Sequence, residues 1–328
     1  MNNVLITGIN GQDGVILTSK LLKLSKDINI LGTSRTPDKI SFLNKISIFN
    51  EIKDLPNINI IDVDFFDPKQ LNKIITNFRP DTVFNLMGPS NVNESINNED
   101  YYIKNIYLSF ECLVTQLSQL NKKIKFFQAS SSEMFGESSS PLNEQSHLQP
   151  RNPYSCAKYK IKESIENNKL DTKNIIFLEA IMFNHDSELR TRNFLIMKII
   201  SDTIDIYKKK IKKFNVGSLD YIRDWSYAGD VMNAAIQMIK LETNHSFVVG
   251  SGTGTSIEKL LEITFSEFNL EWHKFIEVDK NLLRKNDPLK IVSDPSKIEN
   301  KLGWSTKYSI DEMIRKFIKY KMDVGSNL

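Results

Sequence analysis

Short hydrophobic runs and amphipathic stretches alternate along the first half of the chain. The hydrophobic runs are rich in β-branched and aromatic residues and occupy residues 3–7, 28–32, 58–63, 82–86, 124–129 and 175–181. Between them, apolar residues recur at the three- to four-residue spacing of helices over residues 14–26, 68–77 and 102–120. Strands that alternate with helices build parallel sheets. The pattern therefore predicts an α/β domain over residues 1–182.

The regular alternation fades after this point. A helical pattern over residues 194–211 is followed by short strands and mixed loops, and neither an internal repeat nor a Pro/Gly/Ser-rich linker separates the halves. We expect a smaller, mixed α/β C-terminal domain over residues 183–328, some of whose segments return to the first domain.

The composition narrows the classes of function. Among 328 residues, 43 Lys and Arg face 40 Asp and Glu, and the resulting net charge of +3 gives little support to nucleic-acid binding. Two cysteines cannot form a disulfide framework or a cysteine-based zinc site, and we expect no metal centre. No apolar run approaches the ~18 residues of a membrane span. The N-terminus lacks a signal-peptide pattern. We therefore expect a cytoplasmic protein without nucleic-acid or membrane partners.

A glycine turn follows the first predicted strand. The spacing suits a dinucleotide, because the first glycine permits a tight turn, the second lets the backbone approach a pyrophosphate, and the third lets helix and strand pack closely. The pyrophosphate then lies at the helix N-terminus. The turn favours a Rossmann-like, doubly wound parallel sheet, although an ordinary strand–helix turn remains the alternative. Its candidate cofactor-binding residues are Gly8, Asn10, Gly11, Gln12, Asp13 and Gly14.

The end of the second predicted strand indicates which dinucleotide binds. NAD-specific proteins usually place a carboxylate there, but this chain has Arg35 and no acid until Asp38. A guanidinium suits a 2′-phosphate, so we infer NADP, with a solvated surface arginine as the alternative. Residues after the third and fourth strands are further candidates, because ligands bind beyond the carboxyl ends of such strands. They are Asp64, Phe65, Leu86, Gly88 and Ser90.

Two groups of residues suggest catalysis. Tyr154 and Lys158 are one helical turn apart, and a nearby ammonium lowers a tyrosine pKa, so that the phenol can act as a base. The alternative is a surface pair. Ser131, Ser132 and Glu133 follow the fifth strand, where hydroxyls can bond a substrate oxygen and a carboxylate can act as acid and base. Turn-forming serines and a helix-capping glutamate are the alternatives.

Several segments resemble the GDP-mannose 4,6-dehydratase family within the extended short-chain dehydrogenase/reductase superfamily. They are TGINGQDG at residues 7–14, QASSSE at 128–133, PRNPY at 150–154, FNHDS at 183–187, GSLD at 217–220 and RDW at 223–225. There are departures from the family pattern: Ser131 replaces its threonine, Pro89 and Asn91 replace Gln and His, and Thr36 replaces the second arginine of an Arg-Arg loop.

The resemblance implies roles for individual residues. Ser131, Glu133, Tyr154 and Lys158 match the family's catalytic residues. Cofactor contacts are implied for Tyr101, Lys158, His185 and Arg190. Contacts to the nucleotide-sugar are implied for Ser90, Ser132, Asn184, Asn193, Lys198, Arg223 and Arg284. The resemblance also implies a homodimer through the helices at residues 102–120 and 154–167, or a homotetramer. The changed Arg-Arg loop favours the dimer of the two.

The reaction implied is NADP-dependent 4,6-dehydration of a GDP-linked sugar, with GDP-mannose as the expected substrate. A GDP-heptose 4,6-dehydratase is a close alternative, because one further carbon would change only the shape of the pocket. A 4-epimerase or 4-ketoreductase would need the Tyr/Lys pair but not Glu133. A non-catalytic NADP-binding scaffold is the alternative from a different class, and the intact Tyr154, Lys158 and Glu133 argue against it.

Overall fold

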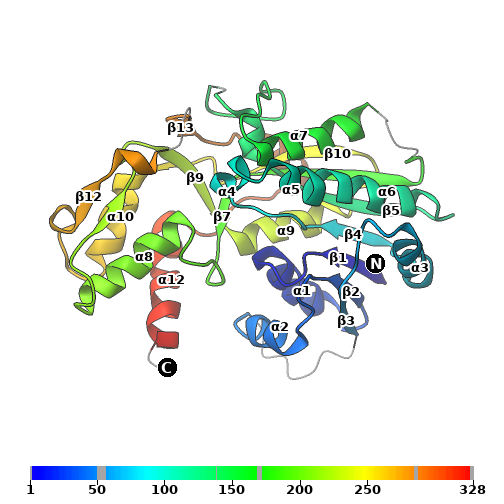
Figure 1. The fold of residues 1–328 in the computed structure, drawn as a ribbon, viewed down its shortest axis with the longest axis horizontal. Helices are drawn as coiled ribbons and strands as arrows, with labels where there is room; N and C mark the ends of the chain where they lie inside the picture. The colour runs from blue at the N-terminus through cyan, green and yellow to red at the C-terminus, as the bar shows by residue number, and fades with distance from the viewer. Residues whose placement is uncertain (1, 50–56, 138, 168–171, 284–286, 326–328) are drawn as a thin grey trace. The chain divides into compact units, whose positions relative to one another are not determined.

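The chain folds into two compact units (Figure 1). The computed structural model describes residues 2–49, 57–137, 139–167, 172–283 and 287–325. The first unit comprises residues 1–136, 147–182 and 232–247, and the second comprises 137–146, 183–231 and 248–328. The boundary expected from the sequence, between residues 182 and 183, is also a boundary between the two units of the structure. The structure adds that residues 232–247 belong to the first unit and residues 137–146 to the second.

The first unit is built on a seven-stranded sheet with the order β10-β6-β5-β4-β1-β2-β3. Neighbouring strands from β6 to β3 are parallel, with Thr7 of β1 beside Thr33 of β2 and Asn85 of β4. The strands are β1 (Asn3–Thr7), β2 (Asn29–Thr33), β3 (Ile58–Ile61), β4 (Thr82–Asn85), β5 (Ile124–Ser131), β6 (Ile175–Met182) and β10 (His245–Val249). The predicted α/β, doubly wound fold is confirmed. Its strand order reverses between β1 and β4, which is where such sheets bind ligands.

Helices alternate with these strands. They are α1 (Gln12–Leu24), α2 (Lys39–Ile46), α3 (Pro68–Phe78), α4 (Val92–Ile96), α5 (Glu99–Ile103), α6 (Ser109–Ser118), α7 (Pro153–Glu166) and α9 (Ala228–Met238). One core cluster joins a face of the sheet to α3, α6 and α7 through buried side chains such as Val83, Phe110, Phe126 and Ile161. Successive strand residues point to opposite faces of the sheet, so every second residue, such as Ile124 and Phe126 of β5, belongs to this cluster.

The helical stretch predicted over residues 102–120 is not one regular helix. It consists of α5, a π-helical turn at Lys104–Leu108, and α6. The loop after β4 passes close to this turn, because a Cβ at Gly88 would lie 2.9 Å from Cγ1 of Ile106, and Gly88 has a φ of +128°. A π turn inserts an extra residue into a helix and is frequent at functional sites.

The second unit has its own sheet and core. Its strand β9 (Ile222–Tyr227) pairs with β7 (Asn184–Asp186) and β13 (Lys290–Ile291) in parallel and with β11 (Gly254–Ser256) in antiparallel fashion. A separate pair consists of β8 (Phe214–Val216) and β12 (Ile276–Val278). Buried residues of three helices, including Ile200, Leu261 and Phe317, form its core. The helices of this unit are α8 (Leu195–Tyr207), α10 (Ile257–Ser266), α11 (Ser296–Leu302) and α12 (Ile310–Gly325).

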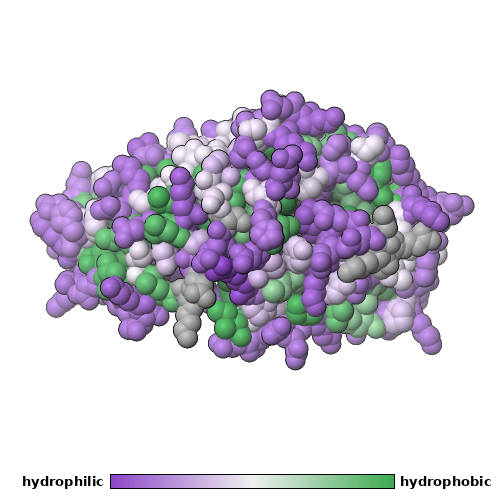
Figure 2. Space-filling model, turned by 90° about the horizontal axis from the view of Figure 1, so that it is seen from above, coloured by the Kyte–Doolittle hydropathy of each residue, from purple (hydrophilic) through white to green (hydrophobic). Residues whose placement is uncertain are grey.

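The face of the molecule seen from above the view of Figure 1 is mainly polar. On the face seen in Figure 2, hydrophilic residues predominate and hydrophobic ones occur in small scattered groups. Of the helices within the described ranges, none combines the length and the apolar character needed to span a bilayer.

Candidate functional site

The glycine turn adopts the geometry expected of a dinucleotide-binding turn. The backbone N–H groups of Gly8 and Ile9 donate to the carbonyl of Thr33 at 3.0 and 3.2 Å, which ties the end of β1 to that of β2. Gly8 has a φ of +72°. A Cβ on Gly14 would lie 2.5 Å from the carbonyl oxygen of Ile9, so only glycine allows α1 to approach β1 this closely. The N-cap of α1 is Gly11, which leaves the first turn of the helix without a side-chain cap.

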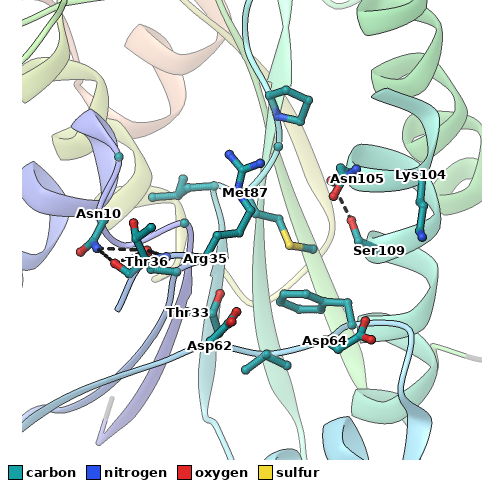
Figure 3. A pocket seen from close by; sticks show the side chains of 18 of the residues that line it. Asn10, Thr33, Arg35, Thr36, Asp62, Asp64, Met87, Lys104, Asn105 and Ser109 are labelled. Atoms are coloured by element: carbon teal, nitrogen blue, oxygen red, sulfur yellow. Dashed lines mark hydrogen bonds between the residues drawn. The ribbon is translucent and has the colours of Figure 1, made fainter. Parts of the chain in front are cut away.

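A pocket of about 670 Å³ opens beside this turn, at the carboxyl ends of β1 to β4 (Figure 3). All its lining residues belong to the first unit. Nine predicted cofactor-binding residues line it: Gly8, Asn10, Gly11, Arg35, Asp64, Phe65, Leu86, Gly88 and Tyr101. Gln12, Asp13, Gly14 and Ser90 are not among the lining residues. The size and lining suit an elongated ligand with charged groups.

The loop after β2 supplies polar groups to one side of the pocket. The Asn10 side chain donates to Ser34 Oγ at 3.0 Å and to the carbonyl of Thr36 at 2.7 Å, and Arg35 donates to the hydroxyl of Tyr101. The carboxylate of Asp38 does not line the pocket, because it caps α2 by accepting from two backbone N–H groups.

Sequence reasoning missed several lining residues. Asp62 lies inside the run predicted as a strand over residues 58–63, whereas β3 ends at Ile61, so the strand-end argument that indicated Asp64 missed Asp62. Lys45 on α2, and Lys104 and Asn105 on the π turn, also line the pocket. No motif marks these residues, because packing of the helices brings them there.

The end of β5 and the start of α7 are bonded to each other. The Nζ of Lys158 donates to the carbonyl of Ala129 at 2.6 Å, and the Asn152 side chain donates to Oε2 of Glu133 at 3.2 Å. The Oγ of Ser131 accepts the Glu133 N–H at 3.3 Å and caps the short 3₁₀ helix Ser132–Phe135. These contacts place Ser131 and Glu133 beside the first turns of α7.

Tyr154 and Lys158 lie on those first turns. Helix α7 begins with a capping box, in which Asn152 and Ser155 bond each other's backbone N–H groups. The ammonium of Lys158 lies 5.9 Å from the centre of the Tyr154 ring. Lys158 is buried, which excludes the alternative of an ordinary surface pair. Burial lowers the pKa of Lys158 to about 8, although the charges of Asp13 and Glu179 oppose this shift.

The other predicted residues belong to the second unit. Arg190 is bonded to Asp186 at 2.5 Å and stacks on Phe194, with its guanidinium carbon 3.9 Å from the ring centre. The Nδ1 of His185 is 2.8 Å from the carbonyl oxygen of Phe183. Asn184 and Asn193 are exposed. Arg284 lies outside the described residues.

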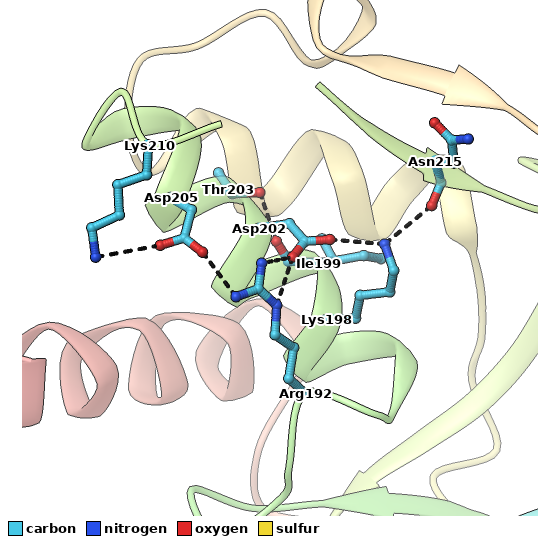
Figure 4. Close-up of polar contacts among 8 residues, drawn as sticks. All are labelled: Arg192, Lys198, Ile199, Asp202, Thr203, Asp205, Lys210 and Asn215. Atoms are coloured by element: carbon cyan, nitrogen blue, oxygen red, sulfur yellow. Dashed lines mark hydrogen bonds and ion pairs between the residues drawn. The ribbon is translucent and has the colours of Figure 1, made fainter. Parts of the chain in front are cut away.

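Two further predicted binding residues of this unit, Arg223 and Lys198, are also paired with carboxylates. Arg223 donates to Asp287 at 2.8 Å. Lys198 donates to Oδ2 of Asp202 at 2.8 Å and to the carbonyl of Asn215 at 3.1 Å (Figure 4). The other carboxylate oxygen of the buried Asp202 accepts from Arg192. Asp202 therefore holds two cations on one side of α8.

The chain is similar to known proteins along nearly its whole length. The sequence model of the family described as GDP-mannose 4,6 dehydratase matches residues 5–317. GDP-mannose 4,6 dehydratase 2 of Arabidopsis thaliana is 28% identical over 327 residues, covering 98% of this chain and 87% of that protein. GDP-mannose 4,6 dehydratase of Homo sapiens is 27% identical over 341 residues, covering 97% and 90%.

Solved structures share the fold. UDP-glucose 4-epimerase from Thermotoga maritima, solved with UDP-glucose, is 21% identical with a TM-score of 0.83, and 99% of each chain is covered. RMD from Pseudomonas aeruginosa, complexed with NADPH, is 20% identical with a TM-score of 0.77, covering 98% of this chain and all of that one. The family resemblance of the sequence is thus confirmed. Because the family model spans nearly the whole chain, this chain belongs to the GDP-mannose 4,6 dehydratase family, whose members are nucleotide-sugar dehydratases of the lyase class.

Proposed function

We propose that this protein is an NADP-dependent dehydratase that converts GDP-mannose to GDP-4-keto-6-deoxymannose. The observation that carries the proposal is the position of Glu133. It is bonded to Asn152, the N-cap of the helix that bears Tyr154 and Lys158. A 4-epimerase or 4-ketoreductase needs the Tyr/Lys pair alone, whereas a dehydratase also needs a carboxylate that removes a proton from carbon 5. Family membership supports the same reaction.

The pocket of the first unit fits a nicotinamide dinucleotide. The glycine turn and the start of α1 would hold the pyrophosphate. Asp64 and Phe65 would hold the adenosine, and Leu86, Gly88 and Ser90 would lie on the nicotinamide side. The buried Oδ1 of Asn10 has no hydrogen-bond partner among the described residues, which is consistent with a site built for a ligand. Arg35, Ser34 and the absence of a carboxylate in the lining loop after β2 support NADP. We also assign cofactor contacts to Tyr101, His185 and Arg190.

The first half of the reaction oxidises carbon 4 of the sugar. The chemistry that NADP supplies when bound is reversible hydride transfer with the sugar. Tyr154, as phenolate, takes the proton from the carbon 4 hydroxyl. The Lys158 ammonium stabilises the phenolate, and its bond to Ala129 holds it in place. Ser131 bonds the carbon 4 oxygen and orients it.

The second half expels water. A ketone at carbon 4 makes the proton on carbon 5 acidic. Glu133 removes that proton as a base and then, as an acid, protonates the carbon 6 hydroxyl, which leaves as water. The carbon 5–carbon 6 double bond that remains would take hydride at carbon 6, supplied by the bound cofactor, and a proton at carbon 5. Tyr154 would supply that proton from the one it took from the carbon 4 hydroxyl, so the sequence consumes no external reductant and Tyr154 is again a phenolate.

We assign recognition of the GDP portion to polar residues of the second unit. The cations suit a diphosphate, because charge-assisted hydrogen bonds fix its position without entering the chemistry. Asp202 orients Lys198 for this purpose. Ser90 and Ser132 of the first unit would contact the sugar. The second-unit residues are Asn184, Asn193, Lys198, Arg223 and Arg284.

Assembly and location follow from the same proposal. A homodimer would form through α5, α6 and α7, and the change from arginine to Thr36 argues against a tetramer built on an Arg-Arg loop. A cytoplasmic location suits an enzyme that uses GDP-sugars.

The decisive experiment uses GDP-mannose, NADP⁺ and no added reductant. We expect mass spectrometry to show loss of one water from the sugar nucleotide and formation of a 4-keto group. Glu133→Gln should stop the reaction after the first half, so that NADPH accumulates in a single turnover while no water is lost. Tyr154→Phe should abolish NADPH formation as well, and serves as the matched control.

Other outcomes would overturn the proposal in distinct ways. Water loss from Glu133→Gln at the wild-type rate would remove this residue from the mechanism. Epimerised GDP-sugar of unchanged mass would indicate a 4-epimerase. Intact GDP-mannose, together with dehydration of a GDP-linked heptose, would change the assigned sugar.

A further inference from the structure

Lys45 is a second cation in the pocket lining, beside the loop that carries Arg35, whose guanidinium donates to the hydroxyl of Tyr101. It lies near the end of α2 and lines the pocket with Arg35, Ser34 and Thr36. Its Nζ donates to the carbonyl of Asn10 at 3.1 Å. In the described part of the chain no carboxylate pairs with Lys45, and the bond to Asn10 uses one of the three donors of its ammonium.

The same Asn10 organises the loop that carries Arg35. Its side-chain amide bonds Ser34 Oγ and the Thr36 carbonyl, so Lys45 and the loop after β2 are held to one residue. The Oδ1 of Asn10 is buried without a partner among the described residues. Lys45 thus has a fixed place beside the loop, whereas Arg35 itself is exposed.

We propose that Lys45 is the second cation of the 2′-phosphate site and a determinant of the preference for NADP over NAD. This inference rests on the proposed function, which assigns NADP to the pocket. A 2′-phosphate carries more than one negative charge near neutral pH, and one exposed arginine matches only part of it. An ammonium and a guanidinium on two elements, α2 and the loop after β2, bind such a group from two directions.

Lys104 provides a matched control. It is also a lysine of the pocket lining, but it lies on the π turn, where its Nζ is 4.7 Å from the centre of the Phe66 ring. Figure 3 shows Lys104 on the opposite side of the pocket from Asn10 and Thr36. Removing either lysine lowers the charge of the pocket by one unit. Lys45 is bonded to Asn10 beside the loop that carries Arg35, whereas Lys104 lies over Phe66.

The test compares the dissociation constants of NADP⁺ and NAD⁺ by calorimetric titration, without substrate. We expect Lys45→Met to weaken NADP⁺ binding by about 10- to 100-fold, the range of one charge-assisted hydrogen bond, and NAD⁺ binding by less than about 3-fold. Lys45→Arg should retain most of the preference. Lys104→Met should change both affinities by similar factors.

Each other outcome overturns the inference. If Lys45→Met weakens the binding of NADP⁺ and NAD⁺ equally, Lys45 has a structural role only. If Lys104→Met lowers the preference for NADP⁺ as much as Lys45→Met does, the preference comes from the total positive charge of the pocket. If the wild type prefers NADP⁺ and Lys45→Met keeps that preference, only this inference fails. If the wild type itself prefers NAD⁺, the proposed cofactor fails with it. Thermal melting of each variant checks that a loss of affinity is not a loss of folding.

Discussion

A buried ion pair between α7 and β6 gives the most quantitative prediction. Lys162 of α7 and Glu179 of β6 are 7% and 5% exposed, and their Nζ and Oε2 atoms are 2.9 Å apart. The hydroxyls of Ser130 and Ser246 donate to the same carboxylate, each at 2.7 Å. Burial alone would lower the pKa of Lys162, but the charge of Glu179 and hydrogen bonds to Glu179 and to the exposed Glu166 more than offset this, so the pKa is raised. Lys162 therefore keeps its charge at neutral pH and lies directly against the Glu179 side chain.

Removing only the cation should be costly. In Lys162→Met, the Glu179 carboxylate keeps two hydroxyl donors but loses its counter-charge in a low-dielectric site. Breaking a buried pair in this way costs about 3–5 kcal/mol of the free energy of unfolding. The double variant Lys162→Met/Glu179→Gln removes both charges, and its amide can still bond both serines. We expect it to lie within about 2 kcal/mol of the wild type.

Urea unfolding followed by circular dichroism measures these differences, with the variants compared at a common slope. Lys160→Met is the matched control, because this exposed lysine of the same helix lies over the face of Tyr107, and its loss should cost less than about 1 kcal/mol. The reasoning is refuted if Lys162→Met is no less stable than Lys160→Met. It is also refuted if the double variant is as unstable as the single one.

Two further predictions concern the glycine turn and Lys158, which we propose acts in catalysis. Gly14→Ala should lower the melting temperature of the cofactor-free protein clearly more than Gly11→Ala. A Cβ at residue 14 would lie 2.5 Å from the Ile9 carbonyl oxygen, whereas one at residue 11 would lie 3.2 Å from its nearest neighbour. Equal shifts in melting temperature would contradict this. The pKa of about 8 at Lys158 predicts that kcat/KM falls above about pH 8, because the ammonium proposed to stabilise the phenolate is present below that pH and lost above it. A pH–rate profile that does not fall there would refute this prediction. So would a Lys158→Met profile that still falls at the same pH.

The strands could be predicted from the sequence because each is buried in a parallel sheet. Such strands appear as short, continuous apolar runs, and all six predicted runs overlap a strand of the sheet. The helical stretch at residues 102–120 shows where this reasoning stops. Its apolar spacing is helical throughout, and the π turn at Lys104–Leu108 changes the register by one residue. A periodicity read over a long window does not resolve such a local change.

The site was predictable to the extent that it depends on strand ends. Asp64 and Arg35 were found because parallel strands bring their following loops to one edge. Lys45 and Lys104 reach the same pocket from helices, and nothing in the local sequence distinguishes them from solvated lysines. Asp38 shows the converse, because a carboxylate close to the cofactor loop in sequence is used for capping α2. Its use as a cap removes it as a ligand for a ribose.

Asn152 connects the two parts of the proposed chemistry. Its side-chain oxygen accepts the Ser155 N–H and fixes the start of α7, while its amide donates to Glu133. The helix that positions Tyr154 therefore also positions the proposed carbon 5 base, and the bond from Lys158 to Ala129 fastens the same helix to β5. A dehydratase of this type must present two bases to neighbouring carbons of one sugar. Both proposed bases lie where the end of β5 is hydrogen-bonded to the start of α7. The distance between them is therefore set by the backbone and these bonds, whereas two long side chains on mobile loops would leave it variable.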